Sequence, residues 1–274
     1  MLASVLCGFV GTYIVTRRLV FISGGITHAS FGGIGLGLFA GFPPILGAAL
    51  FSVCSACGVQ WLSQQRAMRE DSAIATVWTV GMALGIVFTF LAPGFTPDLT
   101  TYLFGNILTV TTTDLWMLAI LCVVVVTYFV CNIHTIIHTA FDRDHALARH
   151  LPVVRLEYFL MILIALTIVA TLRMVGIVLV ISLLTLPQMT ANLFVHSFRG
   201  IIVGGSLIGF LSCLGGLGAS YILNIPSGAC IILVGIVIHG ACRCCLLRLG
   251  SRQVLRLRSG QIIAPKSRTR HEAP

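Results

Sequence analysis

The chain has 274 residues, of which 57% are hydrophobic and only 9% are charged. A soluble domain carries about 25% charged residues, so this composition excludes a soluble globular protein and indicates an integral membrane protein. Apolar stretches of about 20 residues recur along the chain, and each is long enough to cross a hydrocarbon core of about 30 Å as a helix. The expected fold class is therefore all-α, with a net charge of +9 that comes mostly from the C-terminal tail.

Basic residues predict the topology, because Lys and Arg near membrane ends accumulate on the cytoplasmic side. They lie at Arg17 and Arg18, at Arg66 and Arg69, at Arg143, Arg149 and Arg155, at Arg199, and from Arg243 to Arg270. With these clusters inside, the N-terminus lies outside and the C-terminus lies in the cytoplasm.

About nine transmembrane helices are expected, and merging or shortening one of them would leave eight. They cover approximately residues 1–16, 25–41, 44–61, 72–91, 115–132, 155–173, 173–192, 200–223 and 226–246. The apolar length between Arg155 and Asn192 would make one helix of about 57 Å, so it must hold two spans, hinged at Arg173 on the outside. Asp71 is expected to cap the fourth helix, and residues 95–114 to form an outer loop with a short, partly inserted element.

Glycines recur at helical contact spacing in two of the predicted spans. They are Gly33, Gly37 and Gly41 in the second span and Gly81 and Gly85 in the fourth. Small residues at this spacing let membrane helices approach closely, so these positions predict packing seams.

A short cytoplasmic helix is expected between the fifth and sixth spans, over residues 140–152. Asp142 suits its N-cap, Asp144 its first turn and Arg149 its last turn, and Pro152 would stop it. The chain has no G-x-x-x-x-G-K-[ST] phosphate cradle, and no carboxylate lies at the middle of a predicted span, as a proton-coupled carrier would usually require. The short helix is therefore a candidate docking element for an energy-supplying partner, and a plain solvated connector is the alternative.

His28 is the leading candidate for contacting transported cargo. It lies in the apolar, glycine-dense segment 23–37, and an ionisable residue inside a membrane helix is costly, so it marks by default a path for something polar. The alternative is a neutral core histidine bonded to a backbone carbonyl.

Three other histidines are weaker candidates for a metal pathway. His134 and His138 lie one turn apart at the inner end of the fifth helix. There they would either bind a metal ion as it leaves the pathway or remain hydrated at the membrane–water interface. His239 matches no motif, and core packing is the expectation there.

Polar residues surround a proline in the seventh span. Pro187, Gln188 and Thr190 would either line the inner pathway, acting as a hinge, or satisfy backbone groups that the proline leaves free.

Six blocks follow one another along the chain in a specific order and spacing. They are Val15 to Leu19, the stretch with His28 and Ala29, Glu70 to Ile74, Tyr102 to Leu108, Asp142 to Pro152, and Val175 to Ala191. Together they resemble the membrane subunits of ATP-binding-cassette importers for zinc, manganese and iron, known as the ABC-3 permeases. The resemblance covers approximately residues 1–245.

The resemblance implies an ABC importer permease fold in the inner membrane of a bacterial cell. It implies a permease homodimer around a central pathway, separate cytoplasmic ATPase subunits and an extracytoplasmic metal-binding protein that delivers the ion. ATP would act only on the partner subunit and drive alternating access, so the chain is expected to be no enzyme and to hold no permanent cofactor. The short cytoplasmic helix then resembles a coupling helix, with contacts from Asp142, Asp144, Ala146, Leu147 and Arg149.

In the family, the stretch around His28 usually reads Gly-Asp-x-x-x-His, which places a carboxylate and an imidazole on one helix face. Gly24 stands at the aspartate position here. A site without this oxygen ligand should favour zinc or ferrous iron over manganese, so zinc is the first expected ion, with manganese or iron next. A second His28 across the dimer axis would add a ligand. The rival hypothesis is an ATP-independent channel or secondary carrier for a small cation.

The chain is expected to divide into a polytopic transmembrane domain, residues 1–246, and a basic cytoplasmic tail, residues 247–274. A solvated tail that helps to set the topology is the main expectation. Alternatively, so basic a segment would bind anionic lipid headgroups or RNA. Of these two, membrane lipids are the expected partner, and no nucleic acid is expected to bind.

Overall fold

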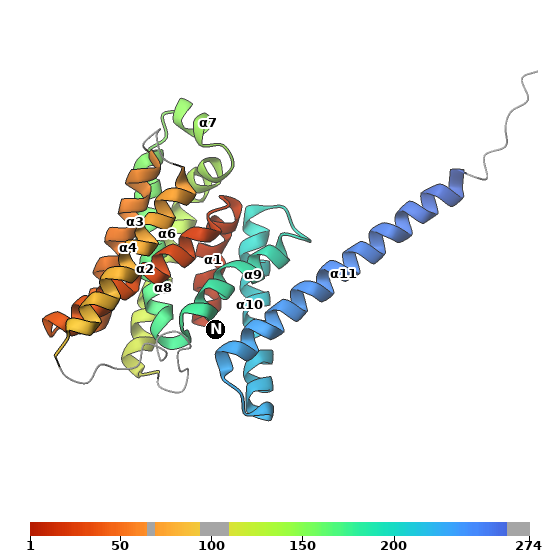
Figure 1. Ribbon diagram of the computed structural model, residues 1–274. Helices are drawn as coiled ribbons and strands as arrows, with labels where there is room; N and C mark the ends of the chain where they lie inside the picture. Colours follow the sequence, from red (N-terminus) through yellow and green to blue (C-terminus); the bar gives the residue numbers. More distant parts are fainter. Residues whose placement is uncertain (65–68, 94–109, 262–274) are drawn as a thin grey trace, which may run out of the picture.

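The computed structural model describes residues 1–64, 69–93 and 110–261, and this part of the chain is helical throughout, without a strand. The helices, labelled as in Figure 1, are α1 (Leu2–Thr16), α2 (Val20–Ala40), α3 (Pro44–Gln64), α4 (Glu70–Leu91), α6 (Thr112–Phe141), α7 (Arg143–Ala148), α8 (Val153–Val175), α9 (Ile177–Ala191), α10 (Phe198–Leu223) and α11 (Ser227–Gln261). The all-α class predicted from composition is confirmed.

Six of these helices are long and apolar enough to cross a membrane: α3, α4, α6, α8, α10 and α11. Helices α1 and α9 are apolar but have 15 residues each, which corresponds to about 22 Å of helix. Helix α2 has 21 residues and is rich in glycine. Within the described residues these nine helices correspond in order to the nine predicted spans, and α7 corresponds to the predicted short connector.

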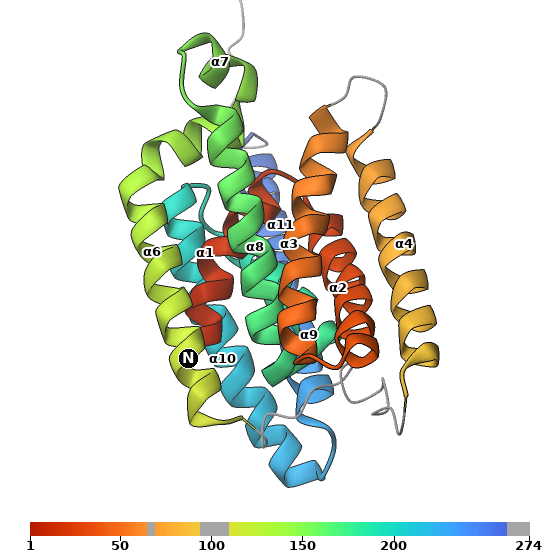
Figure 2. The same cartoon turned by 90° about the vertical axis from the view of Figure 1, so that its left-hand side faces the viewer.

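The bundle is built around α1 and α8. Helix α8 is the most buried of the six long apolar helices; it contacts α3 on one side and α6 on the other, while α1 packs on α6, α9 and α10. Helix α2 lies between α3 and α4, as Figure 2 shows. Helix α7 projects from one end of the bundle, and the N-terminus lies in the half away from it.

Glycine contacts bring α2 against both of its neighbours. A Cβ added at Gly33 would meet the backbone of Gly47 on α3, and one added at Gly85 on α4 would meet the backbone of Phe31 and Gly32 at 2.7–3.0 Å. Only a residue without a side chain allows such an approach, so the predicted packing seams are confirmed at Gly33 and Gly85.

Gly41 differs from the other glycines of this series. It has φ +77° and nothing within 4 Å of an added Cβ. It ends α2 in the left-handed conformation that glycine adopts most readily, so the prediction that it packs against another helix is wrong.

Two local predictions are corrected by the structure. Helix α4 begins at Glu70 with Arg69 as its N-cap, so Asp71 lies in the first turn instead of capping the helix. There its carboxylate still faces the positive end of the helix dipole. The break between α8 and α9 falls at Gly176, with φ +81°, three residues beyond Arg173, because glycine takes this backbone conformation without strain.

Two helices extend further than predicted. Helix α6 continues nine residues past Asn132 to Phe141, and α11 continues past Leu246 to Gln261. The predicted inserted element in residues 95–114 falls largely on residues 94–109, outside the described part of the chain, as do the tail residues 262–274.

Candidate functional site

The His28 imidazole on α2 stacks on an aromatic ring of α4. It stacks on Trp78 with ring centroids 4.6 Å apart and an angle of 4° between the planes, and the Phe31 ring lies 6.5 Å away. Its Nδ1 atom is buried and has no hydrogen-bond partner among the described residues. The structure therefore holds the plane of the ring by stacking and leaves Nδ1 without a hydrogen-bond partner in the described residues.

Gly24 lies one helical turn before His28 and has room beside it. A Cβ added at Gly24 would meet only Ile181 Cδ1, at 3.9 Å, whereas a Cβ at the next residue, Gly25, would overlap the Ile74 side chain. The position at which the resemblance implies an aspartate is therefore open to a side chain, although here it offers no oxygen ligand.

The remaining candidate histidines lie in different surroundings from His28. His134 and His138 are exposed on the last turns of α6. The Nδ1 atom of His239 lies 2.9 Å from Thr190 Oγ1, which itself donates to the Leu186 carbonyl at 2.7 Å. This contact joins α11 to α9. Among the described residues, no group of three or more His, Cys, Asp or Glu is placed to hold a metal ion.

The polar groups around Pro187 mainly serve the backbone. Pro187 lies inside α9 and cannot donate to the carbonyl one turn earlier. The fully buried Gln188 donates through Nε2 to the Cys7 carbonyl at 2.7 Å and so joins α9 to α1, while its Oε1 atom has no partner in the described part of the chain.

Helix α7 is capped as predicted. Asp142 Oδ1 accepts a hydrogen bond from the His145 backbone N–H at 2.9 Å. Ala146 is completely buried, while Leu147 is 39% exposed and Arg149 is exposed at the C-cap. The helix ends at Ala148, earlier than predicted from Pro152, which instead is the N-cap of α8. The result is a short helix with one side anchored and another open.

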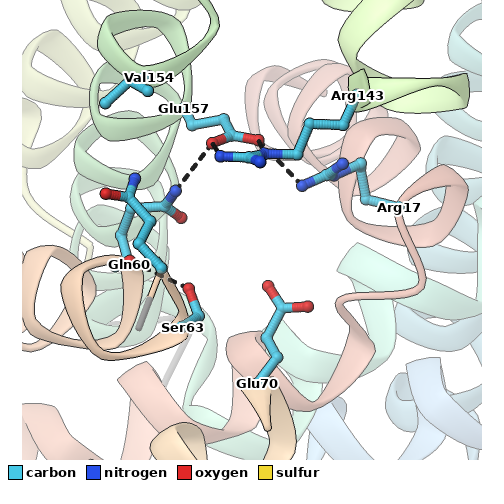
Figure 3. A pocket seen from close by; sticks show the side chains of 8 residues that line it. Arg17, Gln60, Ser63, Glu70, Arg143, Val154 and Glu157 are labelled. Atoms are coloured by element: carbon cyan, nitrogen blue, oxygen red, sulfur yellow. Dashed lines mark hydrogen bonds and ion pairs between the residues drawn. The ribbon is translucent and has the colours of Figure 1, made fainter. Parts of the chain in front are cut away.

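A buried ionic cluster beside α7 was missed by the sequence reasoning. Glu157 on α8 is 1% exposed and accepts hydrogen bonds from Arg17 Nη2 at 3.1 Å, Arg143 Nε at 2.9 Å and Nη2 at 3.3 Å, and Gln60 Nε2 at 3.0 Å. We call these four residues the Glu157 cluster (Figure 3). The hydrogen bonds to Glu157 raise the pKa of Arg143 above its ordinary value, so this guanidinium remains charged.

The Glu157 cluster borders a cavity of about 430 Å³ at the α7 end of the bundle. Glu70, at the start of α4, points into this cavity from the side opposite Glu157 (Figure 3). The only sequence signal for the cluster was an acidic residue inside an apolar run, five residues after Pro152. The positions of Arg17 and Arg143 in the sequence indicate the cytoplasmic side, but nothing in the sequence indicates that they share this carboxylate.

These features define a polytopic helical membrane protein with a capped connector helix and an imidazole on a glycine-rich helix. The model of the ABC 3 transport family matches residues 1–242, and the chain belongs to that family. The manganese transport system membrane protein MntC of Listeria monocytogenes is 35% identical, over 85% of this chain and 83% of that protein. A "Probable metal transport system membrane protein" of Chlamydia pneumoniae is 37% identical, over 85% of this chain and 81% of that protein.

Solved structures give the same fold. PsaBC from Streptococcus pneumoniae in complex with Fab matches with a TM-score of 0.77 and 28% identity, covering 88% of this chain and 87% of the matched chain. The resemblance to ABC-3 permeases inferred from the six sequence blocks is confirmed, and so is the ABC importer permease fold.

Proposed function

We propose that this chain is the membrane-spanning permease subunit of an ATP-driven importer of divalent transition-metal ions. The observation that carries the proposal is the placement of α7, which is capped, anchored by Ala146 and Arg143, and open on its other side. In a member of the ABC 3 transport family, such a helix offers a docking surface for the cytoplasmic ATPase subunits. The family match also favours ATP coupling over an ATP-independent channel or carrier.

The proposed importer contains two copies of this chain, two ATPase subunits and an extracytoplasmic metal-binding protein, in the inner membrane of a bacterial cell. Arg17 and Arg143, both predicted to be cytoplasmic, border the same cavity at the α7 end, which supports one cytoplasmic face there. The N-terminus is then outside and the C-terminus inside. ATP binds only the partner subunits, whose closure switches the permease between outward and inward states. Apolar side chains exposed on the long helices, such as Trp116 and Ile120, contact lipid.

Zinc is the proposed first ion. An imidazole suits zinc, whereas manganese prefers oxygen ligands, and Gly24 supplies no carboxylate beside His28. A second His28 across the dimer axis completes part of the ligand set. Manganese is the second candidate, because MntC of Listeria monocytogenes carries that name, and iron is the third.

Proteoliposomes test the transport function directly. Vesicles holding this chain with its ATPase should take up divalent metal only when ATP and the delivery protein are both present. An ATPase that cannot hydrolyse ATP is the control and should give no uptake. Metal uptake by this chain alone, driven by a pH gradient, would contradict the proposal and favour the carrier.

Gly24→Asp should shift the metal preference toward manganese. The added Cβ fits beside Ile181, and the carboxylate would stand one turn from His28 on the same helix face. We expect manganese uptake relative to zinc uptake to rise about tenfold, which corresponds to roughly 1.4 kcal/mol in relative binding, measured by competition in proteoliposomes. Gly24→Asn has nearly the same shape without the charge; an equal shift in that variant would exclude the carboxylate as the cause.

A further inference from the structure

Helix α7 depends on the rest of the molecule for its position. It has only six residues, too few for a stable isolated helix, and it contacts the two helices that flank it, α6 and α8. Its first residue, Arg143, places two guanidinium nitrogens on the two carboxylate oxygens of Glu157. Such bidentate, charge-assisted pairs fix both distance and orientation, so Glu157 holds the first residue of α7 in place on α8.

The same carboxylate also binds α1, which leads into α2, and α3, which flanks α2 on one side. Arg17 is the C-cap of α1 and stands three residues before the start of α2, and its Nη1 atom also donates to the Thr139 carbonyl near the end of α6 at 3.2 Å. Gln60 lies in the last part of α3, which packs on α2. One buried side chain thus joins α7 to α1 and α3 at the end of the bundle where α2 starts.

Helix α2 has little freedom to move independently of these contacts. Backbone meets backbone at Gly33 against Gly47 of α3 and at Gly85 of α4 against α2. Packed interfaces of this kind shift between discrete arrangements and do not deform gradually. A displacement of Arg17 and Gln60 therefore carries α2, and the His28 side chain on it, along with them.

The cavity beside the Glu157 cluster gives such a displacement room. Its volume of about 430 Å³ separates the cluster from Glu70 at the start of α4. The ends of α1, α3 and α4 can approach one another there without first displacing packed side chains.

We propose that Glu157 is the positioning residue that couples α7 to α2, so that a displacement of α7 moves the helix carrying His28. This inference rests on the proposed function, because the docked ATPase is what displaces α7. It assigns roles to Glu157, Arg17, Arg143 and Gln60 that are separate from metal binding and from contact with the ATPase.

The test measures the coupling ratio, the number of metal ions transported per ATP hydrolysed, in the reconstituted complex. Arg143→Gln cuts the link to α7 but leaves Arg17 and Gln60 on Glu157. We expect the ratio to fall about 5- to 150-fold, which is the fold-change that a typical coupling free energy between two sites corresponds to. Assembly with the ATPase should be retained. Arg143→Lys, which keeps the charge but not the fork of donors, should restore part of the ratio.

Gln60→Leu is an independent test of the same link. Gln60 is buried on α3 and is not part of α7, so this substitution does not change the surface that α7 offers to the ATPase. It should lower the ratio as well. A normal ratio in Gln60→Leu together with a low ratio in Arg143→Gln would mean that Arg143 acts through direct contact with the ATPase, and would overturn the inference.

Arg155→Gln is the matched control, since Arg155 is exposed near the same end of α8 and the same charge is removed. It should leave the coupling ratio unchanged, and a fall equal to that of Arg143→Gln would overturn the inference by assigning the effect to surface charge. Failure of the proposed function has a different signature, because the unsubstituted complex would then show no ATP-dependent metal uptake at all.

Discussion

Metal uptake should fall by at least about 100-fold when His28 is replaced by alanine. Loss of an outer-shell partner of a metal ligand already costs about 10- to 100-fold in affinity or activity, and His28→Ala removes the proposed ligand itself. The measurement is ATP-dependent metal uptake into proteoliposomes, combined with metal binding to the purified complex. Folding should survive, because the stacking on Trp78 contributes only about 0.5–1.5 kcal/mol.

His196→Ala is the matched control for this prediction. His196 is exposed in the connection between α9 and α10, so its removal should change neither metal binding nor uptake. Normal uptake by His28→Ala would show that His28 only packs α2 against α4 and that the metal pathway lies elsewhere.

Glu157→Gln should lower the free energy of unfolding by about 1–3 kcal/mol, the cost of leaving hydrogen-bonding groups without a partner, because Arg17 and Arg143 are 19% and 34% exposed and water replaces part of the lost interaction. The amide has nearly the same volume, but it carries no charge, and its NH2 group replaces one of the two acceptor oxygens that the guanidinium groups use. Arg17 and Arg143 are then left at the cluster without their counter-charge. Reversible unfolding by SDS in mixed micelles, followed by circular dichroism, measures the loss.

Glu70→Gln is the control for the stability measurement. Glu70 borders the same cavity but is not a member of the Glu157 cluster, so we expect a loss below about 1 kcal/mol, the typical contribution of one hydrogen bond. A loss as large as that of Glu157→Gln would show that any charge removed from the cavity has this effect, and that the hydrogen bonds of the cluster are not its cause.

The order of the helices could be predicted from the sequence because it depends on composition over windows of about 20 residues. Their ends were less predictable. Helix α6 extends to Phe141 through a stretch in which histidine and threonine residues interrupt the continuous apolar run. The break between α8 and α9 depends on a single backbone angle at Gly176. Arg173 indicated that a break lies nearby, but nothing in the sequence located it at Gly176.

The candidate site divides in the same way. Asp142 was identified as a helix cap because a capping interaction joins residues only three apart. His28 was identified because a lone ionisable residue stands out in an apolar helix, and Gly24 because of the family resemblance. The Trp78 ring that stacks on His28 comes from another helix, 50 positions further along the chain, and no local pattern connects the two.

The sequence by itself determined the membrane class, the order of the spans, the capped connector and His28, because each follows from local spacing or from the cost of placing polar groups in lipid. Only the tertiary structure decided that Glu157 joins Arg17, 140 positions away, and Gln60, 97 positions away. The physical reason is that these contacts exist only once the packing of α8 against α1 and α3 has placed the ends of the three helices beside one another. A buried carboxylate then has to be satisfied by whichever donors that packing brings within reach.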